Sequence, residues 1–509
     1  MMTEETRTDS RRWGAAAFLC LAVVILGMDD SVLNLALPSI SREFHASTSD
    51  MQWAINAYLL AFAALLMAMG ALGDRFGRKL MFLAGMIVFC LSSLAAALST
   101  SMGMLIACRA FMGIGGGIAI PQTLSIITAT FTDVKERTQA IALWAGVFGF
   151  GYGIGPVVGG VLLNHYEWNS VFIINIPLAM MAFAGGYFFA RESKDQGAPR
   201  LDPQGVLLST AGLFALVYGI TEAGRLTWAE GSVIIWLSMG ALLLFIFAWW
   251  ERRSDHPMLP MKFFKNMSFT GATIPMTLAT LSSAAMLFFL SQYFQSVQGY
   301  SPLAAAVRIL PGAVFTLVVA MAAAPISNRI GIKLTVALGA LVIGGGLFWF
   351  STVTAETPYL TILGPNIIIG AGFGLAWSPA ANSVMGSLPV SRAGIGSAMD
   401  ATTQQVGGVL GVAALGAVLN GIYLDKIADL KVVASLPGEA YEAMRSSIQG
   451  AHMVAGQFPE DISQQIIHGS NDAFTSGMVE AMFIGGIIMA VTTVVTLLIL
   501  PTRIRPAQE

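Results

Sequence analysis

Two adjacent aspartates interrupt a very apolar part of the chain. Residues 25–38 read ILGMDDSVLNLALP, which places Asp29 and Asp30 among isoleucine, leucine, methionine and valine. A carboxylate at the centre of a membrane helix costs about 2.5–3.5 kcal/mol, so a position facing lipid is unfavourable. We expect the acid to face an internal cavity. There, burial favours its protonated form and a bound cation favours its charged form, so one carboxylate can serve both ligands.

Helix geometry separates the two carboxylates. Asp30 and Asn34 are four residues apart and share one face of a helix, whereas Asp29 lies about 100° around the axis. Spacing alone leaves either aspartate as the one that binds a proton or a substrate. A hydrogen bond to a neighbouring helix is the alternative role of each aspartate. Asn34 is expected to belong to the same proton-coupling and substrate-binding site.

Two further charged residues fall within apolar runs. Arg109, in LIACRAFMGIGGG, lies a few residues inside a run that crosses in the opposite direction to the first, so it can reach the depth of Asp29. Its partner could be an acid or the backbone carbonyls of the first helix. Asp400 follows Arg392 by eight residues, roughly 12 Å along a helix. It could carry a proton or make polar contacts with Thr402 and its neighbours.

The composition defines the elements that position these residues. Of 509 residues, 55% are hydrophobic and 11% are charged, against about 25% charged in a soluble domain. Apolar runs of about 20 residues match a hydrocarbon core of about 30 Å. The first run is too long for a signal peptide. We predict an all-α integral membrane protein with fourteen helices, at approximately 13–39, 51–72, 80–99, 103–128, 138–163, 169–190, 204–222, 232–250, 269–296, 303–325, 332–351, 359–386, 394–420 and 478–500.

Basic residues predict the orientation, because loops rich in Lys and Arg stay in the cytoplasm. With fourteen helices and a cytoplasmic N-terminus, most basic residues fall on the inner side, and Arg109 and Arg308 fall within helices. The outer side holds only Arg42, Arg225, Lys426, Lys431 and Arg445. Both termini are therefore expected in the cytoplasm. The polar segment 421–476 is expected to be a long, solvated outer loop, in which IADLKVVASL could form a short helix or hairpin.

An internal repeat suggests a duplication. GALGDRFGRK (Gly70 to Lys79) and APISNRIGIK (Ala324 to Lys333) align without gaps. Each follows the second helix of a six-helix block if helices seven and eight are an insert. We predict a 6 + 2 + 6 architecture: a first bundle at 1–200, two inserted helices at 201–265, and a second bundle at 266–509 that includes the outer loop 421–476. Parallel repeats of this kind place a substrate site between the halves.

Several motifs resemble one family. The turn GALGDRFGRK resembles the loop between helices two and three of the major facilitator superfamily, and LIACRAFMGIGGG resembles its fourth-helix arginine motif. GYGIGPVVGG (Gly151 to Gly160), MDDSVLNLALP, WNSVFIINIP (Trp168 to Pro177) and YFQSVQGYSPL are similar to motifs of its fourteen-helix drug:proton antiporters, of the QacA type. The likeness covers essentially the whole chain. Where some members of this group carry a second acid, this chain has Asn56.

The resemblance implies roles for further residues. It implies that Arg109 takes part in proton coupling, and that motif spacing to Pro38 puts Asp29 at the family's acid. In the turn, it implies a conformational motif at Gly70, Asp74, Arg75, Gly77, Arg78 and Lys79, whose charges form inter-helix ion pairs or only fix topology. In the fifth helix, it implies a hinge or seal at Gly151, Gly155, Pro156, Gly159 and Gly160, for which close packing is the alternative.

The sequence also excludes several functions. All five histidines fall in predicted loops, the three cysteines fall in apolar runs, and no GxxxxGK[ST] loop occurs, so we expect no metal, no cofactor and no ATP. We expect no enzyme activity and no nucleic-acid partner. The prediction is a monomeric antiporter in the cytoplasmic membrane, surrounded by lipid, that exports lipophilic, cationic drugs in exchange for protons. The alternative is a proton-coupled exporter of one endogenous metabolite or self-made antibiotic.

Overall fold

The computed structural model describes residues 4–131, 133–194, 202–254, 257, 263–387 and 393–502. It describes no side chains at 4–10, 67, 71, 134, 135, 138, 142, 145, 148, 149, 393–400, 434 and 435. Every regular element in the described residues is a helix. Twelve helices there are long and apolar enough to span a membrane, or thirteen when the bent helix α2 (Thr48–Phe76) is counted as one span. With the long helix α5 (Val134–His165), every predicted span coincides with helical residues, although the count of fourteen crossings is not fully confirmed.

The first group of helices contains the aspartates. Its helices are α1 (Glu4–Phe44), α2 (Thr48–Phe76), α3 (Arg78–Ala97), α4 (Met102–Thr130), α5 (Val134–His165), α6 (Ser170–Ile173) and α7 (Asn175–Phe189). The helix α2 begins with a capping box, in which the Ser47 hydroxyl accepts from the Asp50 N–H while the Asp50 carboxylate accepts from the Ser47 N–H.

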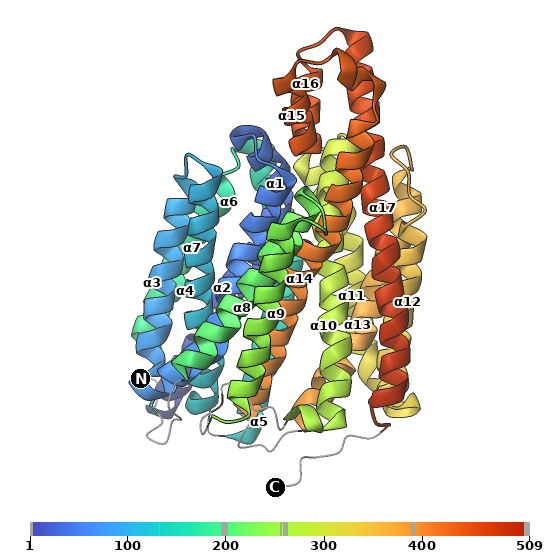
Figure 1. Cartoon of the computed structure of the whole chain (residues 1–509). Coiled ribbons are helices and arrows are strands. Elements are labelled where there is room, and N and C mark those ends of the chain that lie inside the picture. The colour runs from blue at the N-terminus through green and yellow to red at the C-terminus, as the bar shows by residue number, and fades with distance from the viewer. Residues whose placement is uncertain are drawn as a thin grey trace.

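The second group lies beside the first and packs directly against it, and two further helices lie near the centre of the view (Figure 1). It comprises η1 (Phe263–Lys265), α10 (Met267–Gln292), η2 (Tyr293–Val297), α11 (Pro302–Ile330), α12 (Ile332–Phe350), α13 (Tyr359–Gly386), α14 (Ala393–Ala428) and α17 (Glu460–Ile499). Of these two, α8 (Pro203–Arg225) packs against α9 (Gly231–Glu251) and also against α2 and α14. α1 begins and α17 ends at the same end of the molecule (Figure 1), and we call the opposite end the far end.

The two repeated turns have the same backbone conformation and hydrogen bond at their glycine. Gly77, between α2 and α3, has φ of 127°, and Gly331, between α11 and α12, has φ of 86°. The N–H of Gly77 donates to the carbonyl of Gly73, and the N–H of Gly331 donates to the carbonyl of Ser327. Positive φ is the conformation that glycine tolerates best, which explains why both repeats place glycine there.

The segment 421–476 differs from the prediction of a solvated loop. α14 continues to Ala428 and α17 already begins at Glu460, and between them lie η4 (Lys431–Ser435), α15 (Gly438–Ser446) and α16 (Ile448–Ala455). We call the segment 421–476 the cap. Several of its apolar side chains are buried, among them Tyr423, Met444, Ile448, Val454 and Phe474. The cap is therefore a packed helical extension at the far end (Figure 1). Three histidines expected in loops lie in helices: His165 ends α5, His452 lies in α16 and His468 lies in α17.

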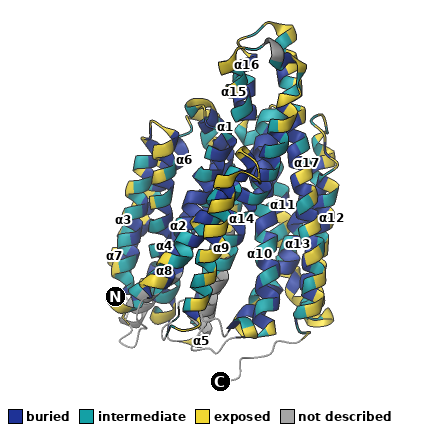
Figure 2. Ribbon diagram, viewed as in Figure 1, coloured by how far each residue is buried: buried dark blue, intermediate teal, exposed yellow. Residues whose placement is uncertain are grey.

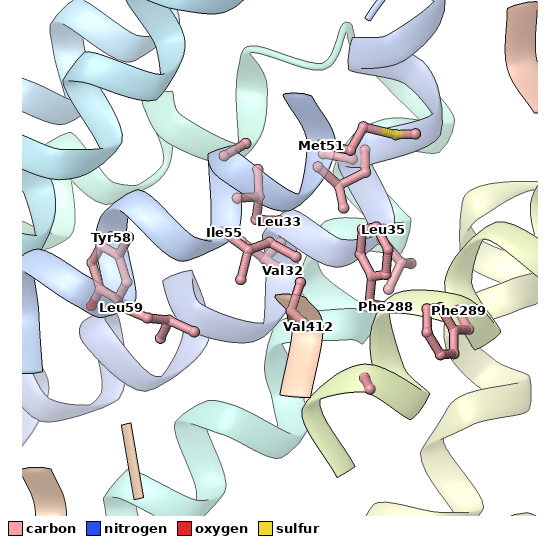
Figure 3. Close-up of a cluster of buried hydrophobic side chains, with 14 of the residues drawn as sticks. Val32, Leu33, Leu35, Met51, Ile55, Tyr58, Leu59, Phe288, Phe289 and Val412 are labelled. Atoms are coloured by element: carbon pink, nitrogen blue, oxygen red, sulfur yellow. The ribbon is translucent and has the colours of Figure 1, made fainter. Parts of the chain in front are cut away.

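The two groups of helices meet toward the far end. There, the Ser291 hydroxyl donates to the Asn34 carbonyl at 2.5 Å, and the Gln295 amide donates to the Leu35 carbonyl at 3.0 Å. Apolar side chains of α1, α2, α10 and α14 pack beside these bonds (Figure 3). Among the described residues, every hydrogen bond between the first group (4–194) and the second group (263–502) is made at this end. The residues of the first group that take part are Asn34, Leu35, Ser41 and Thr48. The structure is thus closed at the far end.

The outer surface is apolar, as a membrane protein requires. Figure 2 shows buried residues where the helices meet and exposed residues along the outside. On α9, for example, Ile235, Leu242 and Phe245 are all exposed. A helix that is apolar all round yet exposed is stable only in contact with lipid or another protein.

Candidate functional site

Asp29 is fully enclosed and forms an ion pair. Its Oδ2 atom lies 2.5 Å from Nη1 of Arg109, and both side chains are 1% exposed. α1 and α4 therefore bring the first aspartate and the fourth-helix arginine together, as their predicted depths suggested. Removing one partner of such a pair would leave an uncompensated charge in a membrane-spanning bundle.

The guanidinium of Arg109 also holds α2. Its Nε donates to the carbonyl of Ala54 at 3.2 Å, and its carbon lies 4.2 Å from the centre of the Tyr58 ring. Both partners lie on one face of α2, since they are four residues apart. Arg109 thus joins α1, α2 and α4 through a charge, a hydrogen bond and a cation–π contact.

The second oxygen of Asp29 is occupied by Asn175. The Asn175 amide donates to Oδ1 of Asp29 at 2.8 Å and also lies 3.2 Å from the Ser93 hydroxyl, which itself donates to the Phe172 carbonyl at 2.9 Å. Asn175 is the first residue of α7, at the break after α6. Asn175 lies in the motif WNSVFIINIP, but no site role was predicted for it from the sequence. An amide in an otherwise apolar run was the signal that could have identified it.

Asp30 has a different environment. Its side chain is half-buried, and it forms no hydrogen bond or ion pair with any described residue. Arg109 and Tyr152 of α5 lie within electrostatic range of its carboxylate. The shared helix face with Asn34 produces no bond between them. Asn34 is buried, and its side-chain oxygen has no partner in the described structure.

Glycines bring α5 against α1 at the level of the aspartates. A Cβ atom on Gly151 would lie 2.5 Å from a backbone oxygen, so only glycine permits this approach. Pro156 lies within the same helix, and Gly160 contacts Ala306 of α11 instead. The contacts on α1 follow successive turns: Gly151 meets Val24, Gly155 meets Met28 and Ser31, and Gly159 meets Val32.

The charged residues of the turn between α2 and α3 form one ion pair in the described residues. Asp74 Oδ1 lies 2.7 Å from Nε of Arg78, whose Nη1 approaches the Ser125 carbonyl of α4 at 3.5 Å. Arg75 is exposed and makes no ion pair there, so the predicted network includes only part of the cluster. Gly70 approaches Pro121 of α4, and a Cβ on it would lie 3.6 Å away.

An acid that the sequence did not single out completes this turn. The carboxylate of Glu192, after α7, accepts from the N–H groups of Lys79 and Leu80 at 3.1 Å each. A Cβ on Gly77 would lie 2.8 Å from that carboxylate. The Lys79 ammonium donates to the Tyr187 carbonyl at 2.6 Å. Glu192 therefore satisfies the first amides of α3, where a negative charge also complements the helix dipole.

The remaining predicted residue is Asp400. It lies in α14, but its side chain is outside the described residues, so its role stays a prediction. In the part of the chain that the structure describes, no group of three His, Cys, Asp or Glu side chains could hold a metal ion.

Comparisons with known proteins agree with this architecture. A family model described as Major Facilitator Superfamily matches residues 19–412. The chain is 32% identical over 487 residues to the multidrug efflux pump LfrA of Mycolicibacterium smegmatis, covering 95% of each protein. It is 29% identical over 492 residues to the tetracenomycin C resistance and export protein of Streptomyces glaucescens, covering 96% of this chain and 91% of that protein.

A solved structure shares the fold. The inward-facing, occupied crystal structure of a bacterial homologue of the human lysosomal transporter Spinster aligns with a TM-score of 0.64 at 16% identity, covering 96% of both chains. At that identity, the likeness concerns the fold alone.

Proposed function

Since this chain belongs to the Major Facilitator Superfamily, we propose that it is a drug exporter of the cell membrane that expels lipophilic compounds in exchange for protons. The names of its relatives, a multidrug efflux pump and an antibiotic export protein, support export of drugs. The alternation between two groups of helices supplies the transport cycle. With the termini in the cytoplasm, as the basic residues indicate, the far end is extracellular and the described structure is closed toward the outside.

The observation that carries proton exchange is the contrast between the two aspartates. Asp29 has both oxygens occupied by protein groups, whereas the half-buried Asp30 has no partner among the described residues. We assign to Asp30 the carboxylate for which a proton and a cationic substrate compete. We assign to Asp29 and Arg109 the task of holding α1, α2, α4 and α7 around it.

The competition explains how the two fluxes are coupled. A protonated Asp30 is neutral and tolerates the low-polarity site, whereas a cation in the site favours the carboxylate and expels the proton. The far-end contacts must separate before the cation can leave and the proton can enter from outside. Binding of one ligand therefore opposes binding of the other, and a proton gradient drives export.

Transport in everted membrane vesicles tests this proposal. Ethidium uptake driven by an imposed pH gradient is expected with the wild type, absent after addition of a protonophore, and absent in Asp30→Asn. Ser31→Ala is a matched control, because the Ser31 hydroxyl donates only to carbonyls of its own helix. Uptake that persists at the wild-type rate in Asp30→Asn would contradict the assignment of Asp30.

A second candidate is export of a single antibiotic or metabolite by the same proton exchange. It is favoured by the tetracenomycin C resistance and export protein, whose name states one compound. Competition among chemically unrelated cations separates the two candidates. Mutual inhibition of uptake supports a multidrug exporter, whereas indifference to all of them supports the single-substrate exporter.

A further inference from the structure

A second arginine within a membrane helix, Arg308 of α11, has an unusual setting. Its guanidinium carbon lies 3.8 Å from the centre of the Tyr300 ring and 5.2 Å from that of Tyr359. One nitrogen, Nη1, donates to the carbonyl of Ala304 at 3.0 Å, one turn earlier in the helix. Two aromatic rings from different segments therefore hold this cation in one place.

Arg308 resembles Arg109 without an aspartate. Both guanidinium groups stack on tyrosine and donate to a backbone carbonyl. Arg109 has the carboxylate of Asp29, whereas among the described residues no carboxylate lies within 4.0 Å of Arg308. The Nε atom of Arg308 is also buried without a hydrogen-bond partner. Such a cation is incompletely compensated by the protein, and an anion that reaches its remaining nitrogen, Nη2, would compensate it.

The surroundings of Arg308 are fixed by hydrogen bonds. The Tyr359 hydroxyl and the Asn366 amide both donate to the carbonyl of Arg308, each at 3.3 Å. Tyr300 follows Gly299, which has φ of 68°, and its N–H donates to the Phe294 carbonyl at 2.9 Å. The Tyr300 hydroxyl itself has no partner in the described structure, so it remains available as a donor. The site is therefore formed in advance of any ligand.

The position of Arg308 in the fold indicates which anion can reach it. Arg308 lies in the second turn of α11, and Tyr359 begins α13, so both stand near the far end of the second group. Apolar neighbours are exposed there, since Val307 is 51% exposed and Leu360 is 79% exposed. In a membrane protein, such a surface contacts lipid. Arginine and tyrosine at the end of a membrane helix lie at the level of the phospholipid headgroups.

We propose that Arg308, Tyr300 and Tyr359 form a binding site for the phosphate of an anionic phospholipid in the leaflet at the far end. Arg308 donates charged hydrogen bonds to the phosphate oxygens, Tyr300 donates its hydroxyl, and Tyr359 keeps the guanidinium oriented. The site is separate from Asp29 and Asp30 and does not depend on the proposed transport reaction.

Thermal unfolding of the purified full-length protein in detergent tests the site. We expect added phosphatidylglycerol to raise the Tm of the wild type by several degrees, and phosphatidylcholine, which carries no net charge, to have little effect. In Arg308→Gln the response to phosphatidylglycerol should disappear. Arg308→Lys retains the charge but loses the planar fork, so it should need about tenfold more lipid for the same shift.

Arg445→Gln is the matched control. Arg445 also lies near a tyrosine, with its guanidinium carbon 5.5 Å from the Tyr441 ring, and its Nε is likewise buried without a hydrogen-bond partner, but it lies on the cap and has its own acid in Glu442 at 3.3 Å. This variant should respond to phosphatidylglycerol like the wild type. Lipid-specific stabilisation that is equal in Arg308→Gln and the wild type would overturn the proposal, as would no stabilisation of the wild type.

Two further arms identify the source of the phosphate. Inorganic phosphate at the same concentration should leave the Tm unchanged; an equal shift would mean that the site takes a free anion rather than a lipid. If Arg308→Gln is too unstable to purify, the Arg308→Lys series decides the question. An unchanged dose dependence in Arg308→Lys would then refute a bidentate phosphate contact.

Discussion

Two faces of α1, one residue apart, place the same side chain in opposite situations. The face of Asp29 is closed, because Arg109 and Asn175 occupy both of its oxygens and exclude solvent. We call the face of Asp30 open, because this half-buried side chain has no hydrogen-bond or ion-pair partner in the described residues. The comparison indicates that Asp29 has a structural role and Asp30 a ligand-binding role. A paired charge is costly to disturb and suits the scaffold. A carboxyl group without a protein partner can exchange a proton for a cation without breaking a contact within the protein.

Breaking the closed face should have the largest effect on stability. Asp29→Leu leaves Arg109 buried without its acid, and we expect a loss of about 3–5 kcal/mol in the free energy of unfolding. Unfolding in mixed micelles of a mild detergent and sodium dodecyl sulfate measures this quantity. A variant as stable as the wild type would mean that the pair does not support the fold.

A smaller loss should follow from Asn175→Ala. The variant removes one charge-assisted hydrogen bond to Asp29 and frees the Ser93 hydroxyl, which corresponds to about 1.5–3 kcal/mol. The same unfolding assay measures it, with Ser31→Ala as a control that should change little. Equal stabilities of the two variants would show that Asn175 contributes nothing beyond packing.

Removing both charges should restore most of the stability. In Asp29→Leu with Arg109→Met, neither charge is left alone, and the net loss should fall to about 0–1 kcal/mol. A double-mutant cycle on the unfolding free energies gives the coupling between the two positions. Additive losses would contradict a direct pair and would place the two residues in separate roles.

The smallest structural effect is expected on the open face. Asp30→Asn breaks no contact with the described protein, so the free energy of unfolding should change by less than about 1 kcal/mol. Transport, in contrast, should be lost. A large destabilisation would show that Asp30 is part of the scaffold, and the comparison between the two faces would no longer hold.

The sequence was sufficient for most of the fold. Apolar runs of membrane length coincide with helices throughout, and the repeated turns at Gly77 and Gly331 adopt the positive φ that a glycine at such a junction suggests. The segment 421–476 was missed because its helices are short and amphipathic and bury their apolar side chains against one another. A search for spans of about 20 apolar residues cannot detect helices of that kind.

The candidate site was predictable in part. The spacing of Asp29 and Asp30 located a polar centre, and the depth of Arg109 suggested a partner on α1. Which acid is enclosed depends on Asn175 and on the glycine row of α5, which approach from distant parts of the sequence. The position of a residue on a helix face does not show which residues of other helices lie beside it. The motif spacing pointed to Asp29 and the face shared with Asn34 pointed to Asp30, and the sequence alone could not decide between them.

Proton release from the purified protein tests the central claim most directly. In weakly buffered detergent solution, adding ethidium should displace a proton from Asp30, and a pH-sensitive dye reports it. We predict release from the wild type and Ser31→Ala, and none from Asp30→Asn although that variant remains folded. Undiminished release from Asp30→Asn would contradict the account, because the exchangeable proton would then reside on another group.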